Sequence, residues 1–194
     1  MNFWCVGRNY ADHAKELGHA VPSEPMIFLK AGSCLVEGSE IRLPAWPGEI
    51  HHELEIALQF STSLNFAKMA LALDLTDRVA QNRLKEKGQP WTLAKSFRGA
   101  CPLSPAVPFR DPRALHLQLL VNGQIRQDGL GKDMIFDAAT LKSFVLERFP
   151  VVPGDWLLTG TPAGVGALKP GDRLEASLSE KETRILQTEW HVVA

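Results

Sequence analysis

The sequence lacks any long hydrophobic run. No apolar stretch approaches the roughly 18 to 20 residues that a membrane-spanning helix requires. The opening residues, MNFWCVGRNY, also lack the charged region and apolar segment of a secretory signal. The sequence therefore predicts a cytoplasmic protein without a membrane partner.

An excess of charge of one sign is also missing. The 194 residues include 21 Lys and Arg against 22 Asp and Glu, which gives a formal net charge of -1. A surface that binds nucleic acid needs a basic excess to neutralise phosphates. We therefore expect no nucleic acid partner.

Cysteine is scarce. The three cysteines, Cys5, Cys34 and Cys101, are odd in number and far apart. This spacing excludes a disulfide framework and a CxxC zinc site. We expect reduced thiols packed in the interior.

The composition is that of an ordinary globular protein, with 45% apolar and 22% charged residues, and the length suits one domain. Thirteen prolines and 15 glycines are spread along the whole chain, so they separate many short elements. No repeat or low-complexity tract is present. The sequence predicts a single mixed domain over residues 1–194, β-rich (α+β), with a few short helices.

Turn motifs indicate where strands lie. Apolar residues alternate over 115–121 before an Asn122-Gly123 turn, which predicts a hairpin over 115–127. Pro-Gly-Asp turns at 153–155 and 170–172 lie next to the strand-like segments WLLTG and RLEASL. The last third of the chain is therefore predicted to be mainly β.

Four segments are predicted to be helical. Asp137 can cap a helix that Pro150 stops, and a helix over 77–87 ends at Gly88. Residues 64–71 are also predicted to be helical in part. A short helix through ADHAKEL would begin near Asn9 or Asp12.

Two glutamates mark the first candidate site. The segment HHELEIAL at 51–58 reads as a strand, so Glu53 and Glu55 point to the same side. Neighbouring carboxylates repel each other, and a hard divalent cation removes that conflict. The alternative is a solvated strand face.

Asp74 would supply a third carboxylate. It lies in the apolar stretch MALALDLT, where a lone buried carboxylate is costly unless it is paired or ligated. Three carboxylates with water suit Mg²⁺ or Mn²⁺, whereas zinc prefers His or Cys. Asp74 could instead cap the end of a helix or strand.

Three further features carry candidate chemistry. His13 and Glu16 are three residues apart, so on a helix the carboxylate can orient the imidazole as a base. Lys95, in WTLAKSF, is expected to meet a carboxylate or a substrate anion. The glycine-rich turn TGTPAGVG at 159–166 could bind a carboxylate through its amides and hydroxyls. An exposed ion pair and a purely structural turn are the alternatives for the first and the last.

Together these segments resemble the fumarylacetoacetate hydrolase family, and in particular its single-domain acylpyruvate hydrolase-like branch. The resemblance runs nearly end to end, and the order of the motifs makes it specific. The motifs are CVGRNYADHAKEL, EPMIFLK, HHELEIAL, LALDLTDRVAQ, GQPWTLAKSF, VNGQIRQDG, MIF and GDWLLTGTPAGVG.

The resemblance implies a β-sandwich roll in which Glu53, Glu55 and Asp74 hold Mg²⁺ or Mn²⁺. The counterpart of His13, oriented by that of Glu16 on a lid helix within residues 1–20, acts as the catalytic base. The substrates implied are small 2-oxo acids, and a homodimer is expected.

The resemblance also assigns roles around the metal. The counterpart of Lys95 stabilises the departing enolate, and Arg78, Gln81 and Thr161 match positions beside or in contact with substrate. Hydrolysis of an acylpyruvate such as fumarylpyruvate or acetylpyruvate is the leading prediction. Oxaloacetate decarboxylation or tautomerisation, dienoate isomerisation and an inactive metal-oxo-acid binder are the alternatives.

Two departures from the family pattern affect this prediction. The segment DLTDRV carries Asp77 where relatives have a small residue and Val79 where they have an acid. The loop between Glu55 and Asp74 is also short. We expect these changes to alter the packing of Arg78, substrate choice or dimer contacts, without removing a ligand.

Overall fold

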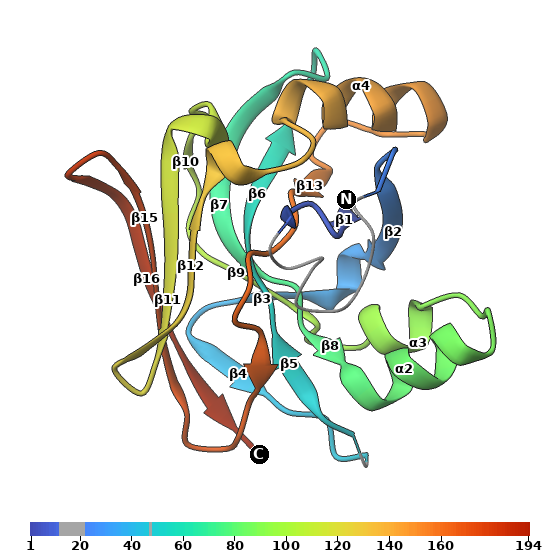
Figure 1. The fold of residues 1–194 in the computed structure, drawn as a ribbon, viewed down its shortest axis with the longest axis vertical. Coiled ribbons are helices and arrows are strands. Elements are labelled where there is room, and N and C mark those ends of the chain that lie inside the picture. The colour runs from blue at the N-terminus through green and yellow to red at the C-terminus, as the bar shows by residue number, and fades with distance from the viewer. Residues whose placement is uncertain (12–21, 47) are drawn as a thin grey trace.

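The computed structural model describes residues 1–11, 22–46 and 48–194. Its largest sheet has eight strands in the order β2-β1-β13-β6-β7-β9-β3, with β10 paired to β7 (Figure 1). The bounds of these strands are β1 Asn2–Gly7, β2 Met26–Ala31, β3 Leu35–Glu37, β6 Leu54–Phe60, β7 Phe66–Leu73, β9 Cys101–Leu103, β10 Val107–Pro108 and β13 Trp156–Leu158.

A five-stranded sheet, in the order β12-β11-β15-β16-β4, stands beside the large sheet on the left of Figure 1. A small third sheet has the order β14-β5-β8. The strands of these two sheets are β4 Glu40–Arg42, β5 Ile50–His52, β8 Thr76–Asp77, β11 Leu115–Val121, β12 Gln124–Leu130, β14 Gly166–Ala167, β15 Arg173–Glu180 and β16 Thr183–Val193.

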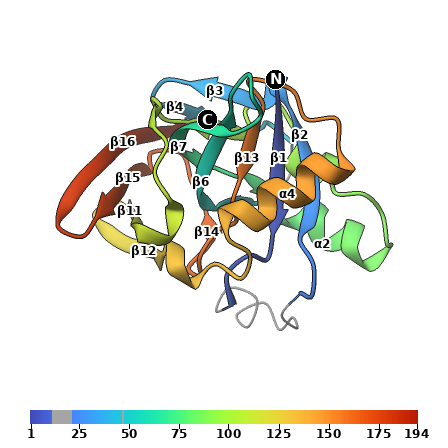
Figure 2. The same ribbon diagram turned by 90° about the horizontal axis from the view of Figure 1, so that it is seen from above.

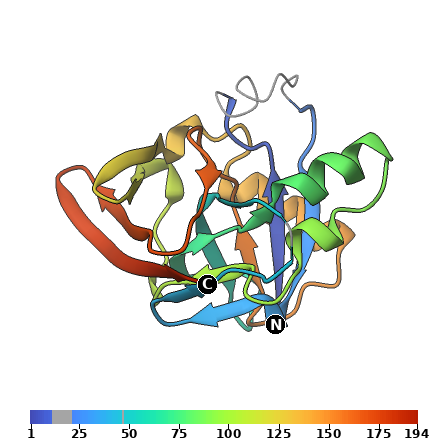
Figure 3. The same cartoon turned by 90° about the horizontal axis from the view of Figure 1, so that it is seen from below.

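The described helices are short and lie at opposite ends of the sheets. Seen from above, α4 crosses one end (Figure 2), and seen from below, α2 and α3 lie together at the other (Figure 3). Their bounds are α2 Arg78–Glu86, α3 Thr92–Lys95 and α4 Ala138–Arg148, with 3-10 turns η1 Gly32–Cys34, η2 Pro112–Ala114 and η3 Gly131–Asp133. None of these described helices is long and apolar enough to cross a membrane.

The core lies between the two larger sheets. Along β11, Leu115, Leu117, Leu119 and Val121 are buried while the residues between them are partly exposed. This strand contacts β6, whose residues are buried on both faces, as expected for a central strand. The strand-dominated architecture confirms the predicted β-rich class.

The predicted hairpin, the helix predicted over 77–87 and the helix capped by Asp137 are confirmed. Asn122 and Gly123 both have positive φ, 53° and 76°, as a two-residue type I′ turn requires. Asp137 accepts a hydrogen bond from the amide of Thr140 and caps α4. Gly88, with φ of 61°, follows the end of α2. The three cysteines are free and buried.

Two local predictions are wrong. Residues 64–71 are not helical, because 66–73 form β7, which pairs along its length with β6. The Ala, Met and Leu residues there favour helices in isolation, and sheet pairing overrides that preference. The segment 51–58 is not one strand either, because β5 ends at His52 and β6 begins at Leu54. The predicted ADHAKEL helix lies almost entirely outside the described residues.

Candidate metal centre and active site

Three buried carboxylates meet at one end of β6 and β7. Glu53 lies between β5 and β6, Glu55 lies on β6, and Asp74 follows the last residue of β7. One carboxylate oxygen from each lies within 4.8 Å of the others. The strand register explains this, because Leu54 pairs with Leu73 and the Asp74 amide donates to the Glu53 carbonyl oxygen over 2.8 Å.

The electrostatics of the cluster suit a hard cation. Burial and the nearby charge of Asp74 raise the pKa of Glu55, even though the Gly160 amide donates a 2.7 Å hydrogen bond to its Oε2. The buried Oδ1 of Asp74 lies 2.8 Å from the ammonium of Lys30. Clustered carboxylate oxygens match the ligands of Mg²⁺ or Mn²⁺. Metal binding by these residues stays a prediction.

Lys95 places a buried ammonium against the cluster. Its Nζ donates to Glu53 Oε2 over 2.8 Å, to Asp74 Oδ2 over 2.5 Å and to Thr76 Oγ1 over 2.6 Å. Burial alone would lower the pKa of Lys95, but the charges of Asp74 and Glu53 outweigh it and raise the pKa. Lys95 is therefore protonated, and it meets carboxylates in an apolar setting, as its sequence context predicts.

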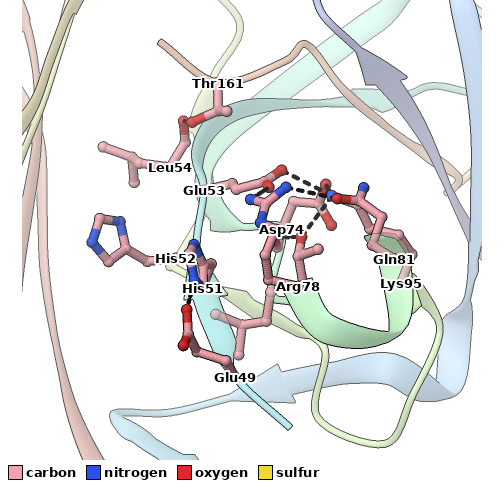
Figure 4. A network of polar contacts seen from close by, with 12 residues as sticks. Glu49, His51, His52, Glu53, Leu54, Asp74, Arg78, Gln81, Lys95 and Thr161 are labelled. Atoms are coloured by element: carbon pink, nitrogen blue, oxygen red, sulfur yellow. Dashed lines mark hydrogen bonds and ion pairs between the residues drawn. The ribbon is translucent and has the colours of Figure 1, made fainter. Parts of the chain in front are cut away.

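Arg78 and Gln81 form one edge of the centre. Arg78 Nη2 donates to Glu53 Oε1 over 2.6 Å, and its Nη1 donates to Gln81 Oε1 over 2.6 Å. Both residues lie on α2 three positions apart, so they share a helix face. Figure 4 shows them converging with Asp74 and Lys95 on the same side of the strand as Glu53.

Sequence reasoning missed Lys30, which is fully buried on β2. Its Nζ lies 2.8 Å from Asp74 Oδ1 and donates to the carbonyl oxygens of Leu75, Ala100 and Lys95. Lys30 thus links the carboxylate of Asp74 to the backbone carbonyl of Lys95. The available signal was a lysine at the end of the otherwise apolar run MIFL.

Gln127 was also missed. It is fully buried on β12, and its Oε1 accepts from the Leu54 amide over 2.9 Å. Its Nε2 donates to Thr161 Oγ1 over 2.7 Å, and Thr161 Oγ1 donates to the Leu54 carbonyl oxygen over 2.8 Å. Gln127 therefore holds the backbone between Glu53 and Glu55 against the glycine-rich turn. That turn binds a carboxylate of the protein itself, through Gly160.

The predicted substrate-contacting residues Arg78, Gln81 and Thr161 line one cavity with the three carboxylates and Lys95. Their contact with substrate stays a prediction. His13 and Glu16, the predicted base and its orienting partner, lie outside the described residues.

The unusual Asp77 is a helix cap. Its carboxylate accepts from the Ala80 amide over 2.9 Å at the start of α2, and from Trp46 Nε1 over 3.2 Å. Val79, in the first turn of α2, is 59% exposed. Neither residue is among the carboxylates and cations of the centre.

Comparisons with known proteins identify the family of this chain. A model of the family described as fumarylacetoacetate (FAA) hydrolase C-terminal matches residues 2–192. The chain belongs to the fumarylacetoacetate hydrolase family. The mitochondrial oxaloacetate tautomerase FAHD1 of Rattus norvegicus is 44% identical over 191 residues, which cover 91% of this chain and 86% of that protein.

Two solved structures of family members share the fold. A protein of Oleispira antarctica, provisionally assigned as a fumarylacetoacetate isomerase/hydrolase, has a TM-score of 0.95 and 42% identity, covering 99% of this chain and 93% of its own. The fumarylpyruvate hydrolase of Pseudomonas aeruginosa, in complex with Mn²⁺ and pyruvate, has a TM-score of 0.91 and 30% identity, covering 100% and 89%. The chain is therefore an enzyme of the hydrolase and isomerase type that this family comprises.

Proposed function

We propose that this protein is a divalent-metal-dependent tautomerase that interconverts the keto and enol forms of oxaloacetate. The relatives named oxaloacetate tautomerase are 39 to 44% identical to this chain, whereas the fumarylpyruvate hydrolase is 30% identical. This difference reverses the order suggested by the motifs alone, which put hydrolysis first.

One observation carries the chemistry: the buried Lys95 ammonium is bonded to both Glu53 and Asp74 in the wall of the cavity. Enolisation of a 2-oxo acid places negative charge on the 2-oxo oxygen. A fixed ammonium in a buried site stabilises such charge without reorganising. Lys95 is held in place by two carboxylates and by Thr76.

Glu53, Glu55 and Asp74 would hold Mg²⁺ or Mn²⁺. When bound, that ion would polarise the 2-oxo group and lower the energy of the enolate. The chain's own residues complete the site: Arg78 and Gln81 are mutually bonded and form its edge. His13, oriented by Glu16, is the proposed group that moves the proton at C3.

The test follows the enol absorbance of oxaloacetate with protein loaded with Mg²⁺ or Mn²⁺. The wild type should speed the approach to keto-enol equilibrium. His13→Ala should slow it by about 10²- to 10⁴-fold while metal affinity stays unchanged. His191→Ala, at an exposed histidine on β16, is the matched control and should behave as wild type. A wild-type rate equal to that of buffer with metal would refute the proposal.

Hydrolysis of acylpyruvates is the second candidate, because the Pseudomonas fumarylpyruvate hydrolase aligns with 100% of this chain. Cleavage of the C–C bond by water leaves the enolate of pyruvate, which the same ammonium would stabilise. Loss of fumarylpyruvate or acetylpyruvate absorbance tests it. Turnover of these compounds, without acceleration of oxaloacetate tautomerisation, would favour hydrolysis over the first proposal.

A further inference from the structure

Beyond the acidic cluster, the cavity wall contains two cations with no role in the chemistry above. Arg8 follows the end of β1, and Lys85 lies on α2. Gln81 lies three residues beyond Arg78 on α2, and Lys85 lies four residues beyond Gln81. This spacing places all three side chains on one helix face. The face that meets the reactive centre thus continues to a further positive charge.

Lys85 is half-buried and lies in the cavity wall. Its Nζ lies 5.3 Å from the centre of the Trp91 ring, and Trp91 lines the same cavity. Burial lowers the pKa of Lys85, and the charges of Arg78 and Arg8 lower it further. Arg8 and Lys85 therefore share one electropositive region.

The negative charge of Glu53 acts on Lys85 and raises its pKa, but Arg78 and Lys95 already bind that carboxylate. Neither Arg8 nor Lys85 forms an ion pair with a described acid, and the carboxylates lining the cavity are already bonded. Their partners include Lys95, Arg78, Lys30 and the amide of Gly160. A partly buried group of cations favours an anion from outside.

The charge of the reactive centre points the same way. Three cations, Lys30, Arg78 and Lys95, equal its three carboxylates in number and contact two of them, Glu53 and Asp74. A divalent ion would then add two positive charges. A 2-oxo acid with one carboxylate would leave part of this charge unbalanced, and Arg8 and Lys85 would increase the excess further. A doubly negative ligand balances the charge better.

We propose that Arg8 and Lys85 form a subsite for the distal carboxylate of a dicarboxylic 2-oxo acid. The acidic cluster would take the 2-oxo-carboxylate end, and the two cations would select substrates that end in a second carboxylate. The inference rests on the proposed function at one point, namely that the 2-oxo-carboxylate end of the ligand binds at the metal centre.

Comparing the binding of two ligands tests the subsite independently of the reactive end. Oxaloacetate and 2-oxobutanoate share the 2-oxo-carboxylate group and the C3 methylene, and they differ in a carboxylate or a methyl group at C4. Their dissociation constants would be measured on Mg²⁺-loaded protein by stopped-flow tryptophan fluorescence, which reads binding before turnover. The wild type should bind oxaloacetate at least tenfold more tightly.

In Lys85→Gln the preference for oxaloacetate should fall about tenfold, which corresponds to about 1.4 kcal/mol. The affinity for 2-oxobutanoate should stay within twofold. Lys85→Arg should restore the preference because it keeps the charge. Lys87→Gln removes an exposed lysine just beyond α2 that does not line the cavity, and it should bind as wild type.

Three results would overturn the subsite: no preference in the wild type, an unchanged preference in Lys85→Gln, or an equal loss of both affinities in that variant. The last result would indicate a general disturbance of the site. A wild type that binds oxaloacetate preferentially without tautomerising it would refute the proposed function and leave the subsite standing. The two ideas therefore fail separately.

Discussion

Ion pairs of nearly equal length occur in two very different parts of this molecule. In the eight-stranded sheet, Lys30 Nζ lies 2.8 Å from Asp74 Oδ1, and the two side chains are 0% and 1% exposed. In the five-stranded sheet, Arg173 Nε lies 2.7 Å from Glu189 Oε1, with exposures of 52% and 36%. Distance does not distinguish them, so their surroundings must.

The surroundings set what each pair contributes. Water screens the pair on β15 and β16, and such pairs add little to stability. Removing one partner of a buried pair leaves a charge without compensation in a medium that solvates it poorly. The buried cluster is therefore costly to disturb and well suited to binding a cation, whereas removing a surface pair from the five-stranded sheet should change stability little.

The largest effect is expected for Lys30→Met, which keeps the bulk of the side chain and removes the ammonium. Asp74 would lose a charged partner, and three backbone carbonyls would lose a donor. The free energy of unfolding should fall by about 3 to 5 kcal/mol, measured by urea denaturation. Lys68→Met, at an exposed lysine on β7, is the control. A loss below about 1 kcal/mol would mean that Lys30 is not needed to balance the cluster.

Asp74→Asn tests the metal centre. Removing one of three negative charges should weaken Mn²⁺ binding by about 10- to 100-fold, which calorimetry can measure on chelator-treated protein. Glu147→Gln, at an exposed acid on α4, should leave the affinity unchanged. Equal affinities in Asp74→Asn and wild type would remove Asp74 from the ligand set.

Asp137 is less buried than the Lys30–Asp74 pair and less exposed than Arg173, with 33% of its side chain exposed. It caps α4. Asp137→Ala should lower the free energy of unfolding by about 1 kcal/mol. The hydrogen bond from the Thr140 amide lowers the pKa of Asp137. The stability that the Asp137 carboxylate contributes is thus present above about pH 3.9, the pKa of an aspartate in the unfolded chain. It is lost as the pH falls through the lower pKa that Asp137 has in the folded protein.

Urea denaturation from pH 7 down to pH 3 would follow this effect. The difference between Asp137→Ala and wild type should shrink below about pH 4. A difference that stays constant over this range would show that the carboxylate charge does not contribute to the cap.

The smallest effect is expected for Arg173→Ala. Its charge partners Glu189 and Glu175 remain solvated when the guanidinium is removed. The urea midpoint should not change measurably, and it should respond to salt no more than that of the wild type. A clear loss of stability would show that the outer sheet depends on its ion pairs and would weaken the contrast between the two sheets.

Local patterns predicted the elements whose structure depends on neighbouring residues. The Asn122-Gly123 hairpin and the Asp137-capped helix are fixed within a few residues, so the sequence alone was enough. Residues 66–73 were predicted incorrectly because their strand depends on pairing with β6. The same pairing sets Asp74 opposite Glu53. Local sequence could not predict that these two residues meet, whereas the resemblance to a family did.

The supporting residues of the site could not be predicted from local sequence. Lys30 contacts the carbonyl oxygen of Ala100, 70 positions away, and Gln127 contacts the amide of Leu54, 73 positions away. Such contacts arise from how the sheets fold together. Glu53, Glu55 and Asp74 could be proposed because their residue type is unusual for an apolar setting, whereas a single Lys or Gln in a strand carries little signal.

The proposed chemistry depends most on one cation held by the carboxylates of Glu53, Glu55 and Asp74. Electron paramagnetic resonance of free Mn²⁺, titrated into protein stripped by a chelator, measures this directly. We predict one tight site per chain, displaced by Mg²⁺ and greatly weakened in Asp74→Asn. A titration in which all added Mn²⁺ stays free, or in which the wild type and Asp74→Asn bind alike, would contradict the proposed metal centre.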